Sequence, residues 1–585
     1  MGYFFSICFC LVINKRIHFS LTPSLSKSLI FKKLILLLSI LLFFTNQSIA
    51  ADVTIASDDS GDYSFTDGDT LSIKNVSEAS GKLTFSGSTT ISGTDNNDEI
   101  SGELNASEGS SLTVRVSTTN NNLLISGQVN INGSLTKTGN GILKFQGDND
   151  QIISNGLTIN TGQVRFTGSK SNQYQFNVTV ANGANASVNQ NSFASGNSIT
   201  VQSGGSLNFY HGTGSGRTYG MNINLAGSGN NNFNSGTAAT LTDSGDTDAH
   251  TTLTGLVTLN GNASVLYGQN DGSVSSTGRY RFGAANGSTT TVINLGSNTF
   301  TLLAEGTNSR TYDFFDQVSG SGTLDIDRYT VANFTQGEGS FADTVNLDVQ
   351  GTLLLDTNDT IASLTGTSTG SVDLQNIVLT IDQDNDTTYA GVITDSTGTG
   401  SIIKSGTGTL TLSGTNTYSG NTTINAGVLS ITNDNNLGTT PGSADVDNII
   451  FNGGSLATTS NITFNANRGV TMTGAGTINV SDSTTSNIQG VITGSGALTK
   501  TGSGTLTLSG TNTYTGNTII NSGIFNVTGT LSDSTAVSVA SGATYDVDQT
   551  DTVASIEGAG NIDIASSKTL TAGDGNDKTS SGIIS

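Results

Sequence analysis

Two acidic clusters have the residue spacing that polysaccharide hydrolysis uses. Asp546 and Asp548 lie two residues apart, and so do neighbouring members of the trio Asp382, Asp384 and Asp386. Residues i and i+2 of a strand share one face, so each cluster would hold its carboxylates together, and a carboxylate pair is the common catalytic set of glycosidases. Both clusters are also rich in the Asn and Asp of turns, and few basic residues are present to bind an anionic sugar. We therefore predict turn or surface acids at both places.

Nucleophilic catalysis has a single candidate stretch. It is a short polar segment that contains the residue types of a Ser/His/Asp set, namely Asp243, Ser244, Asp246, Asp248 and His250. The members of catalytic triads usually converge from separated segments of a rigid fold, and no Gly-x-Ser-x-Gly elbow lies in or beside this segment. His211 is the other histidine after residue 50. We predict a solvated loop here and no catalytic residues.

Two glycine-rich stretches resemble ligand-binding motifs. The sequence AGDGNDKTS at Ala572–Ser580 is similar to one unit of the calcium-binding nonapeptide repeat, but calcium in such repeats is shared between stacked units. GTGSG at Gly212–Gly216 is followed by no Gly-Lys-Ser or Gly-Lys-Thr, which a phosphate-binding loop requires. Neither match predicts a site, so we expect no metal and no cofactor, and the binding residues stay unknown.

The composition indicates which elements must position any such residues. The chain of 585 residues has 74 Gly, 2 Pro and no Trp, and Val, Ile, Leu and Phe recur at alternate positions. Alternation with glycine-rich turns is typical of short β-strands, and a texture that barely changes after residue 51 favours a solenoid of stacked coils. The predicted fold class is all-β.

The first 50 residues differ from the rest. Lys32 and Lys33 precede an apolar run over 34–44, and Ser48-Ile49-Ala50 supplies the small residues of a signal-peptidase site, which predicts cleavage between Ala50 and Ala51. The run is too short for a permanent membrane anchor. A further apolar stretch over 3–13 means either an extended signal peptide or a start codon assigned upstream of the true one. We expect an exported protein with no stable transmembrane segment in the mature chain.

The charge of the mature chain excludes some partners. Both cysteines and five of the 22 basic residues fall in the removed segment, whereas all 45 acidic residues follow it, which leaves a net charge of −28. Such a polyanion repels nucleic acid. We predict no nucleic-acid partner and no disulfides.

One polar sequence is written twice. Residues 404–427 read KSGTGTLTLSGTNTYSGNTTINAG and residues 500–523 read KTGSGTLTLSGTNTYTGNTIINSG, identical at 19 of 24 positions, and SLTKTGNGILKFQG around Lys137 is a weaker copy. Leucines alternate with threonines between glycine-rich turns, as in the coils of a β-helix. Ser, Thr and Asn would stack as ladders between coils. Coils of about 20 residues would give roughly 27 turns and a rod on the order of 130 Å long.

The repeated residues resemble the autotransporter-associated β-strand repeat of type V secreted passenger domains. The matching positions of the first copy are Gly406, Gly408, Leu410, Leu412, Gly414, Asn416, Tyr418, Gly420, Thr422, Ile424, Gly427 and Leu429. Those of the second copy are Gly502, Gly504, Leu506, Leu508, Gly510, Asn512, Tyr514, Gly516, Thr518, Ile520 and Gly523. The second copy departs at Phe525, where the pattern favours Leu. The resemblance implies an elongated right-handed parallel β-helix, export through the Sec translocon and an outer-membrane translocator barrel, and display on a Gram-negative cell surface or release from it.

The resemblance also suggests how the chain is divided. We predict a signal peptide over 1–50, a degenerate β-helical region over 51–380 and a regular repeat region over 381–585. Autotransporters end in a barrel of at least eight strands, and no such pattern occurs in this chain. The phrase SGIIS at its end matches AGVIT and QGVIT, each of which precedes a repeat, so we expect a truncated reading frame.

Two functions from different classes fit these features. The first is a structural or adhesive passenger stalk, not an enzyme, that presents upstream loops to a host cell, matrix or glycan surface, while its C-terminal repeats fold first and help to draw out the remainder. The alternative is a secreted β-helical enzyme that degrades polysaccharide. A self-associating surface layer is a third reading.

Overall fold

The computed structural model describes most of the chain after residue 60. The described residues are 12–13, 16–18, 50–55, 61–74, 79–168, 173–188, 193–194, 196–209, 217–226, 239–243, 251–267, 279–283, 291–304, 309–334, 341–573, 575 and 578–585. They group into two compact units, one of residues 1–284 with 292–294 and one of residues 285–291 with 295–585. The predicted boundary at residue 380 lies inside the second unit and stays a prediction.

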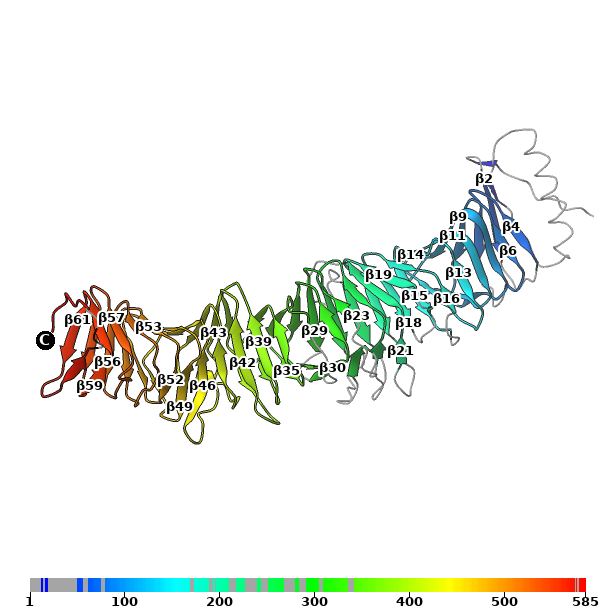
Figure 1. The fold of residues 1–585 in the computed structure, drawn as a ribbon. Helices are drawn as coiled ribbons and strands as arrows, with labels where there is room; N and C mark the ends of the chain where they lie inside the picture. The colour runs from blue at the N-terminus through cyan, green and yellow to red at the C-terminus, as the bar shows by residue number, and fades with distance from the viewer. Residues whose placement is uncertain are drawn as a thin grey trace, which may run out of the picture. The chain divides into compact units, whose positions relative to one another are not determined.

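Strands dominate both units. Within the described residues, η1 (Asp434–Leu437) is the one helical element, a single 3-10 turn, and none of their helices is both long and apolar enough to cross a membrane. From β3 (Ala50–Ile55) onward the strand pairings are parallel, and each strand pairs with the strand of the next coil (Figure 1). The prediction of an all-β parallel solenoid is confirmed.

In the first unit one ladder of strands runs through successive coils. Its members are β5 (Thr70–Ile73), β7 (Ser88–Gly93), β9 (Leu104–Val116), β11 (Val129–Thr138), β14 (Leu157–Ile159), β17 (Val178–Val180), β19 (Ser198–Gln202), β22 (Asn222–Ala226) and β25 (Val257–Leu259). Aliphatic side chains of this ladder face inward and are fully buried, as at Leu71, Ile91 and Val114.

The outward face of the same ladder carries a column of half-buried threonines in register. They are Thr70, Thr90, Thr113, Thr136, Thr158, Thr179 and Thr200. The predicted stacking of polar side chains between coils is therefore confirmed in this unit. Threonine suits such a place because its branched side chain packs well on a pleated surface.

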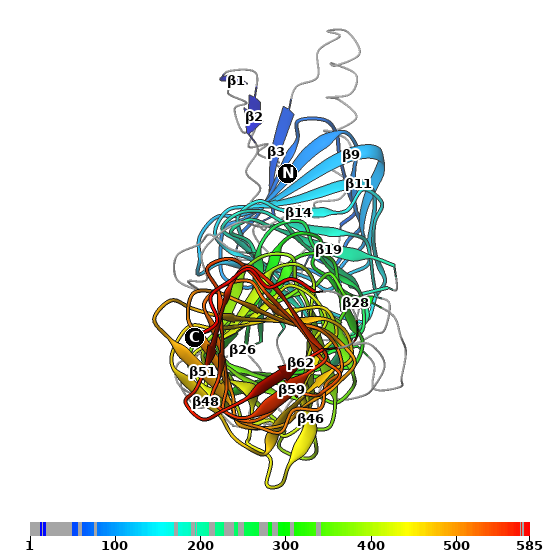
Figure 2. The same ribbon diagram turned by 60° about the vertical axis from the view of Figure 1, so that its left-hand side comes forward.

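Three ladders surround the core in the C-terminal part of the second unit, which Figure 2 shows nearly along the coils. Earlier strands of this unit, such as β32 (Thr323–Ile326) and β34 (Asn346–Val349), belong to a different ladder. The first of the three ladders contains β36 (Asp359–Ile361), β39 (Val378–Asp382), β42 (Ser401–Ser405), β44 (Thr422–Ile424), β46 (Asp445–Phe451), β49 (Arg468–Met472) and β52 (Ile492–Gly494). The second contains β40 (Thr387–Tyr389), β43 (Thr409–Leu412), β45 (Val428–Ile431), β47 (Ser455–Thr458), β50 (Gly476–Val480), β53 (Leu498–Thr501), β55 (Thr518–Ile520), β57 (Ala536–Val539) and β60 (Ser555–Gly558). The third contains β48 (Ile462–Phe464), β51 (Thr485–Ile488), β54 (Thr505–Leu508), β56 (Ile524–Val527), β58 (Thr544–Val547) and β61 (Asn561–Ile564).

The coils vary in length, and many are longer than the sequence predicts. Where Leu412 pairs with Ile431, the coil is close to the predicted length. In the first unit, by contrast, Leu225 pairs with Leu259 of the next coil, which is a much wider separation along the chain. The residues that the structure describes form a solenoid of about 20 turns. The roughly 27 turns expected from the sequence were too many, because coils such as the one between Leu225 and Leu259 are longer than about 20 residues.

The predicted signal-peptide features lie mostly outside the described residues. This holds for the apolar run over 34–44 and for both cysteines. Ala50 and Ala51, which flank the predicted cleavage bond, form the start of β3, and β3 pairs with β5. Cleavage at this bond stays a prediction.

Candidate functional sites in the coils

The duplicated sequence forms the interior and the corners of two coils. Its leucines at 410, 412, 506 and 508 are fully buried, and Gly427 and Gly523 have left-handed backbone angles, with φ of +59° and +70°. A Cβ atom built on Gly414 would lie 1.8 Å from the carbonyl oxygen of Gly391 in the preceding coil. These residues are therefore needed for close stacking, and the interpretation of the repeat as scaffold is confirmed.

The polar residues of the duplicated turn are also used inside the coils. Asn512 accepts the N–H of Ile492 at 3.0 Å and donates to the carbonyls of Gly510 and Thr530, each at 3.0 Å. The hydroxyl of Tyr514 bonds to that of Thr518 at 2.6 Å. In the other copy, Asn416 likewise accepts from Ile393 and donates to Asn436, and Tyr418 bonds to Thr422. These buried groups satisfy one another and thereby hold the corners of adjacent coils together.

A lysine opens each copy of the repeat and points into the core. Lys137, Lys404 and Lys500 are fully buried. In the register of the strands, Lys500 pairs with Ile478 of the preceding coil and Ile520 of the following one. The ammonium groups bond only to backbone carbonyls. Sequence reasoning missed these lysines, although alternation from Leu135 through Lys137 places both on the inward face.

The acidic pair that the sequence singled out does lie on one face. Asp546 and Asp548 both accept hydrogen bonds from the side-chain amide of Asn526 in the neighbouring coil, at 2.8 and 2.9 Å. Burial raises the pKa of Asp546. The hydrogen bond from Asn526 lowers this pKa, and the nearby charge of Asp548 raises it. The pair is therefore engaged in joining two coils.

The acidic trio serves the backbone. Asp384 accepts the N–H and hydroxyl of Thr407, at 3.0 and 2.9 Å, and Asp386 accepts the N–H of Thr409 at 2.7 Å. These hydrogen bonds hold the pKa of both carboxyls below the usual value. Asp382 is exposed at the end of β39. The expectation of turn and surface acids agrees with this geometry.

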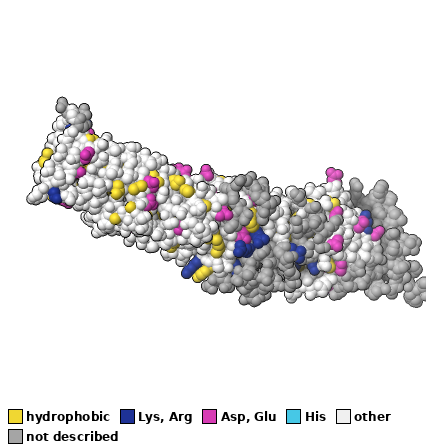
Figure 3. Space-filling model, turned by 60° about the horizontal axis from the view of Figure 1, so that its bottom comes forward, with side chains coloured by type: hydrophobic (Ala, Val, Ile, Leu, Met, Phe, Trp, Pro, Cys, Tyr) yellow, Lys and Arg dark blue, Asp and Glu magenta, His cyan; other side chains and the backbone are white. Residues whose placement is uncertain are grey.

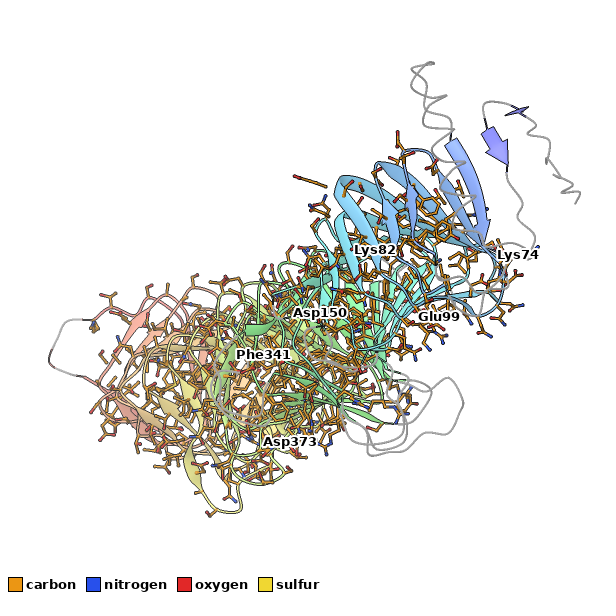
Figure 4. All side chains as sticks on the ribbon, turned by 90° about the vertical axis from the view of Figure 1, so that its right-hand side faces the viewer. Lys74, Lys82, Glu99, Asp150, Phe341 and Asp373 are labelled. Carbon is orange, nitrogen blue, oxygen red and sulfur yellow. The ribbon has the colours of Figure 1, made fainter. Side chains whose placement is uncertain are left out.

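Other acids cap strands in the same way. Phe341, labelled in Figure 4, donates its N–H to the buried carboxylate of Asp359 at 2.9 Å. Asp373, also labelled there, accepts the N–H groups of Gln375 and Ser396 at 3.0 and 2.9 Å. Acids that accept hydrogen bonds from backbone N–H groups hold the neighbouring loops in place. On the face drawn in Figure 3, acidic side chains are dispersed along the surface.

In a different pair of acids, the two carboxylates follow each other in register from one coil to the next, with no amide side chain between them. Asp325 of β32 (Thr323–Ile326) pairs in register with Asp348 of β34 (Asn346–Val349). The hydroxyl of Thr301 donates to Asp325 at 3.0 Å. Burial, with added repulsion from Asp348 and Asp327, raises the pKa of Asp325 to about 6, and burial also raises the pKa of Asp348. The sequence analysis missed this pair because its members are a full coil apart in the chain.

A projecting loop in the second unit is held by one buried arginine. Arg468 donates to the carbonyls of Leu437 and Gly438 at 2.9 and 3.0 Å, and to the side chain of Asn448. Its Nε lies 2.9 Å from the carboxylate of Asp434. The arginine thereby joins both ends of the segment 439–447, which consists of a loop over 439–444 and the start of β46, and residues 442–444 at its tip are exposed.

Several predicted candidates lie outside the described residues. These are Ser244, Asp246, Asp248, His250, His211 and the stretch 212–216, as well as part of 572–580. Asp243 ends β23 (Ala239–Asp243). Within the described ranges, no three His, Cys, Asp or Glu side chains come together in a way that could hold a metal ion.

Comparison with known proteins agrees with the repeat. Three segments match the passenger-associated transport repeat, at residues 135–165, 402–431 and 498–527. The weaker copy around Lys137 is thus one of three. Over 110 residues the chain is 49% identical to the adhesin BmaC autotransporter of Brucella suis biovar 1 (strain 1330), a match that covers 19% of this chain and 3% of that protein. The chain therefore spans a small part of its relative's length. No solved structure matches the chain.

Proposed function

We propose that the chain is an autotransporter passenger and an adhesive stalk, displayed on the bacterial surface or released from it. Three matches to the passenger-associated transport repeat support this proposal. The observation that carries the proposal is that the repeated residues make their hydrogen bonds and packing contacts inside the coils. Side chains such as Asn512 and Tyr514 have buried partners, so contact with another surface falls to loops and outward faces. A rigid scaffold that presents loops is a common design for binding.

The segment 439–447, which consists of the loop 439–444 and the start of β46, is the contact that we propose in the second unit. Val446 is 45% exposed, and the exposed carboxylate of Asp447 lies one residue away. Because Arg468 fixes both ends of this segment, binding would cost little loop-ordering entropy. The adhesin relative supports an adhesive role.

Adhesion is tested with the mature chain, residues 51–585, coated on fluorescent beads. We expect the beads to bind cultured animal cells or immobilised matrix proteins, and a variant with residues 441–447 replaced by a Gly-Ser linker to bind less. Replacement of the exposed pair Ser503 and Asp482, which lie in another coil, provides the matched control. Failure of the beads to bind any of these surfaces would contradict the adhesive role.

Export is the second part of the proposal. A passenger implies an outer-membrane translocator during export, and we propose that the Sec translocon carries the chain across the inner membrane. Protease treatment of intact cells that produce the protein tests display, because a displayed chain is digested without lysis. A chain that is digested only after lysis would refute it.

The second candidate function, degradation of polysaccharide, is favoured by the stacked acids Asp325 and Asp348. An acid whose pKa is raised to about 6 can hold a proton near neutral pH, as a general acid must. The test is release of reducing ends from mixed glycans. Turnover that is lost in Asp325→Asn and Asp348→Asn, and kept in Asp546→Asn, would establish this activity.

A further inference from the structure

The three buried lysines share one geometry in the three copies of the repeat. Lys137 lies in the first unit, and Lys404 and Lys500 lie in the second. Each occupies a position that aliphatic side chains take in the neighbouring coils, as between Val114 and Ile159 for Lys137. A core position for a cation is costly, because burial opposes the charged form. A threefold recurrence of such a costly choice indicates a shared structural task.

Each ammonium group joins the corners of two coils. Lys137 donates to the carbonyls of Thr138 and Gly139 in its own corner, at 2.9 and 2.7 Å, and to that of Thr161 in the next coil, at 3.2 Å. Lys500 repeats this with Thr501 and Gly502, both at 2.9 Å, and with Ser522 at 3.2 Å.

Lys404 has the same set of partners. It donates to the carbonyls of Ser405 and of Gly406, the latter at 2.9 Å, and to that of Ala426 in the next coil at 3.5 Å. In all three copies the distant carbonyl belongs to the residue directly before a corner glycine.

The two corners that each lysine joins are stacked and left-handed. Gly502 and Gly523 have φ of +78° and +70°, and a Cβ atom on Gly523 would lie 2.6 Å from the carbonyl oxygen of Gly502. Gly139 and Gly162 show the same relation at +77° and +74°. The carbonyl that the ammonium reaches is in place only when the next coil turns at this glycine.

We propose that the three lysines are docking pins that set the register of one coil on the next. A coil slipped by one residue would turn its inward side chains to the solvent, and would remove the distant carbonyl from the ammonium. An apolar side chain of similar length would fill the same core space but could not make this distinction, and it would remove the ammonium donor from three carbonyls. The buried ammonium group can therefore make all its hydrogen bonds only when the two glycine corners are stacked in the correct register.

The charged surroundings differ between the copies. Asp382, Asp384 and Asp386 oppose the effect of burial on the pKa of Lys404, whereas burial alone lowers the pKa of Lys137 and of Lys500 to about 8. Lys500 is consequently the cleaner place for a test, because its pin acts without acidic neighbours.

The test compares Lys500→Met, Lys500→Arg and the surface control Lys568→Met in the mature chain. Lys568 bonds to Gln549 at the surface. In Lys500→Met we expect hydrogen exchange of the amides of Asn521 and Ile524, which bond to Lys500 and Gly504 of the preceding coil, to accelerate at least about tenfold. The amide of Asn425, beside the unchanged Lys404 pin, should keep its rate. Lys568→Met should leave all three amides as in the wild type.

Refolding after dilution from denaturant provides the second measurement. If the pin sets register, Lys500→Met lowers the refolding rate by roughly tenfold and changes the unfolding rate much less, and Lys500→Arg, which keeps a cation and its donors, stays closer to the wild type. Unchanged exchange at Asn521 and Ile524, or equal behaviour of the Arg and Met variants, would overturn the proposal. If Lys500→Met does not fold, Lys137→Met is measured at the amide of Asn160, which bonds to Lys137.

Discussion

Two stacks of polar side chains in the second unit differ in the side chain that precedes their aspartates in register, which is Asn526 in one and Thr301 in the other. In one stack Asn526 of β56 is followed in register by Asp546 of β58, and the amide bonds to the carboxylate. In the other, Asp325 of β32 is followed by Asp348 of β34, so two carboxylates face each other across the spacing of adjacent strands, about 4.8 Å. An amide between coils joins them, whereas a second acid repels.

The difference shows how a solenoid can keep a site that its stability does not favour. In the Asn526 stack the amide donates to both Asp546 and Asp548, although Asp563 of β61 follows Asp546 in register and its charge also raises the pKa of Asp546. The Asp325 stack is under electrostatic strain, since burial and Asp348 both raise the pKa of Asp325. Strongly shifted acids concentrate at functional sites, which is why this stack carries our second candidate function.

The largest effect should follow from converting the favourable stack into the unfavourable one. Asn526→Asp removes the two hydrogen bonds to Asp546 and Asp548 and places a third carboxylate beside them. We expect a loss of roughly 2 kcal/mol in the stability of these coils at pH 7.5. Urea-dependent hydrogen exchange of peptides that cover 520–550 measures it.

The matched control is Asn561→Ala, because Asn561 lies on the same ladder and is exposed. It should change the stability by less than about 0.5 kcal/mol. An Asn526→Asp variant as stable as the wild type at pH 7.5 would show that the amide bridge contributes nothing to coil stacking.

The second effect is the reverse conversion, Asp325→Asn. The folded-state pKa of Asp325 is raised to about 6 from 3.8, so the folded chain binds more protons than the unfolded chain between about pH 4 and pH 6. The associated stability is fully present below pH 4 and is lost as the pH rises through 6. Because Asn resembles the protonated acid, Asp325→Asn should gain about 1 kcal/mol at pH 7.5 and little at pH 4.

Unfolding of the wild type and the variant at both pH values measures this gain, with Asp343→Asn as an exposed control. The informative quantity is the difference between variant and wild type, since many other acids titrate in the same range. An equal gain at pH 4 and pH 7.5 would refute the electrostatic explanation.

The sequence contains enough to predict the inward side of the coils and their corners. Alternation places Leu410 and Leu412 in the core, and the spacing of glycines places Gly427 at a corner, as the structure confirms. The i, i+2 spacing also put Asp546 and Asp548 on one face. These features depend on neighbours within a few residues, which is the range over which local rules act.

Features that depend on the register between coils could not be predicted. Asp325 and Asp348 meet only because the length of the coil between them brings both to the same register position, and coil lengths vary with corner insertions. For the same reason the number of turns was overestimated. The lysines were missed for another reason. Alternation puts Lys137 inside, but lysine usually lies at the surface. In addition, one of the carbonyls that accept its hydrogen bonds belongs to the next coil.

The third effect tests how far the strain at Asp325 is relieved by its neighbour. The hydroxyl of Thr301 donates to Asp325 at 3.0 Å and lowers its pKa. Thr301→Val removes this donor and should raise the pKa of Asp325 further. We expect the acid-stabilised range to extend to higher pH and the stability at pH 7.5 to fall by about 1 kcal/mol. Thr365→Val, beside Asp348 in the same stack, is the companion variant. An unchanged pH profile of stability in Thr301→Val would show that the Thr301 hydroxyl does not lower the pKa of Asp325.

The smallest effect is expected at Asp548. It tests how much this carboxylate contributes to the stability of the Asn526 stack. Asp548 is exposed and shares the amide of Asn526 with Asp546, so Asp548→Asn removes one charge while Asp546 keeps its bond. An exposed hydrogen bond to a shared donor contributes little, and we expect a change below about 0.5 kcal/mol by the same exchange measurement. A loss near that of Asn526→Asp would mean that both carboxylates are needed for the bridge. The difference between the Asn526 stack and the Asp325 stack would then depend on how many acids share one donor. The type of residue that faces Asp546 would no longer explain it.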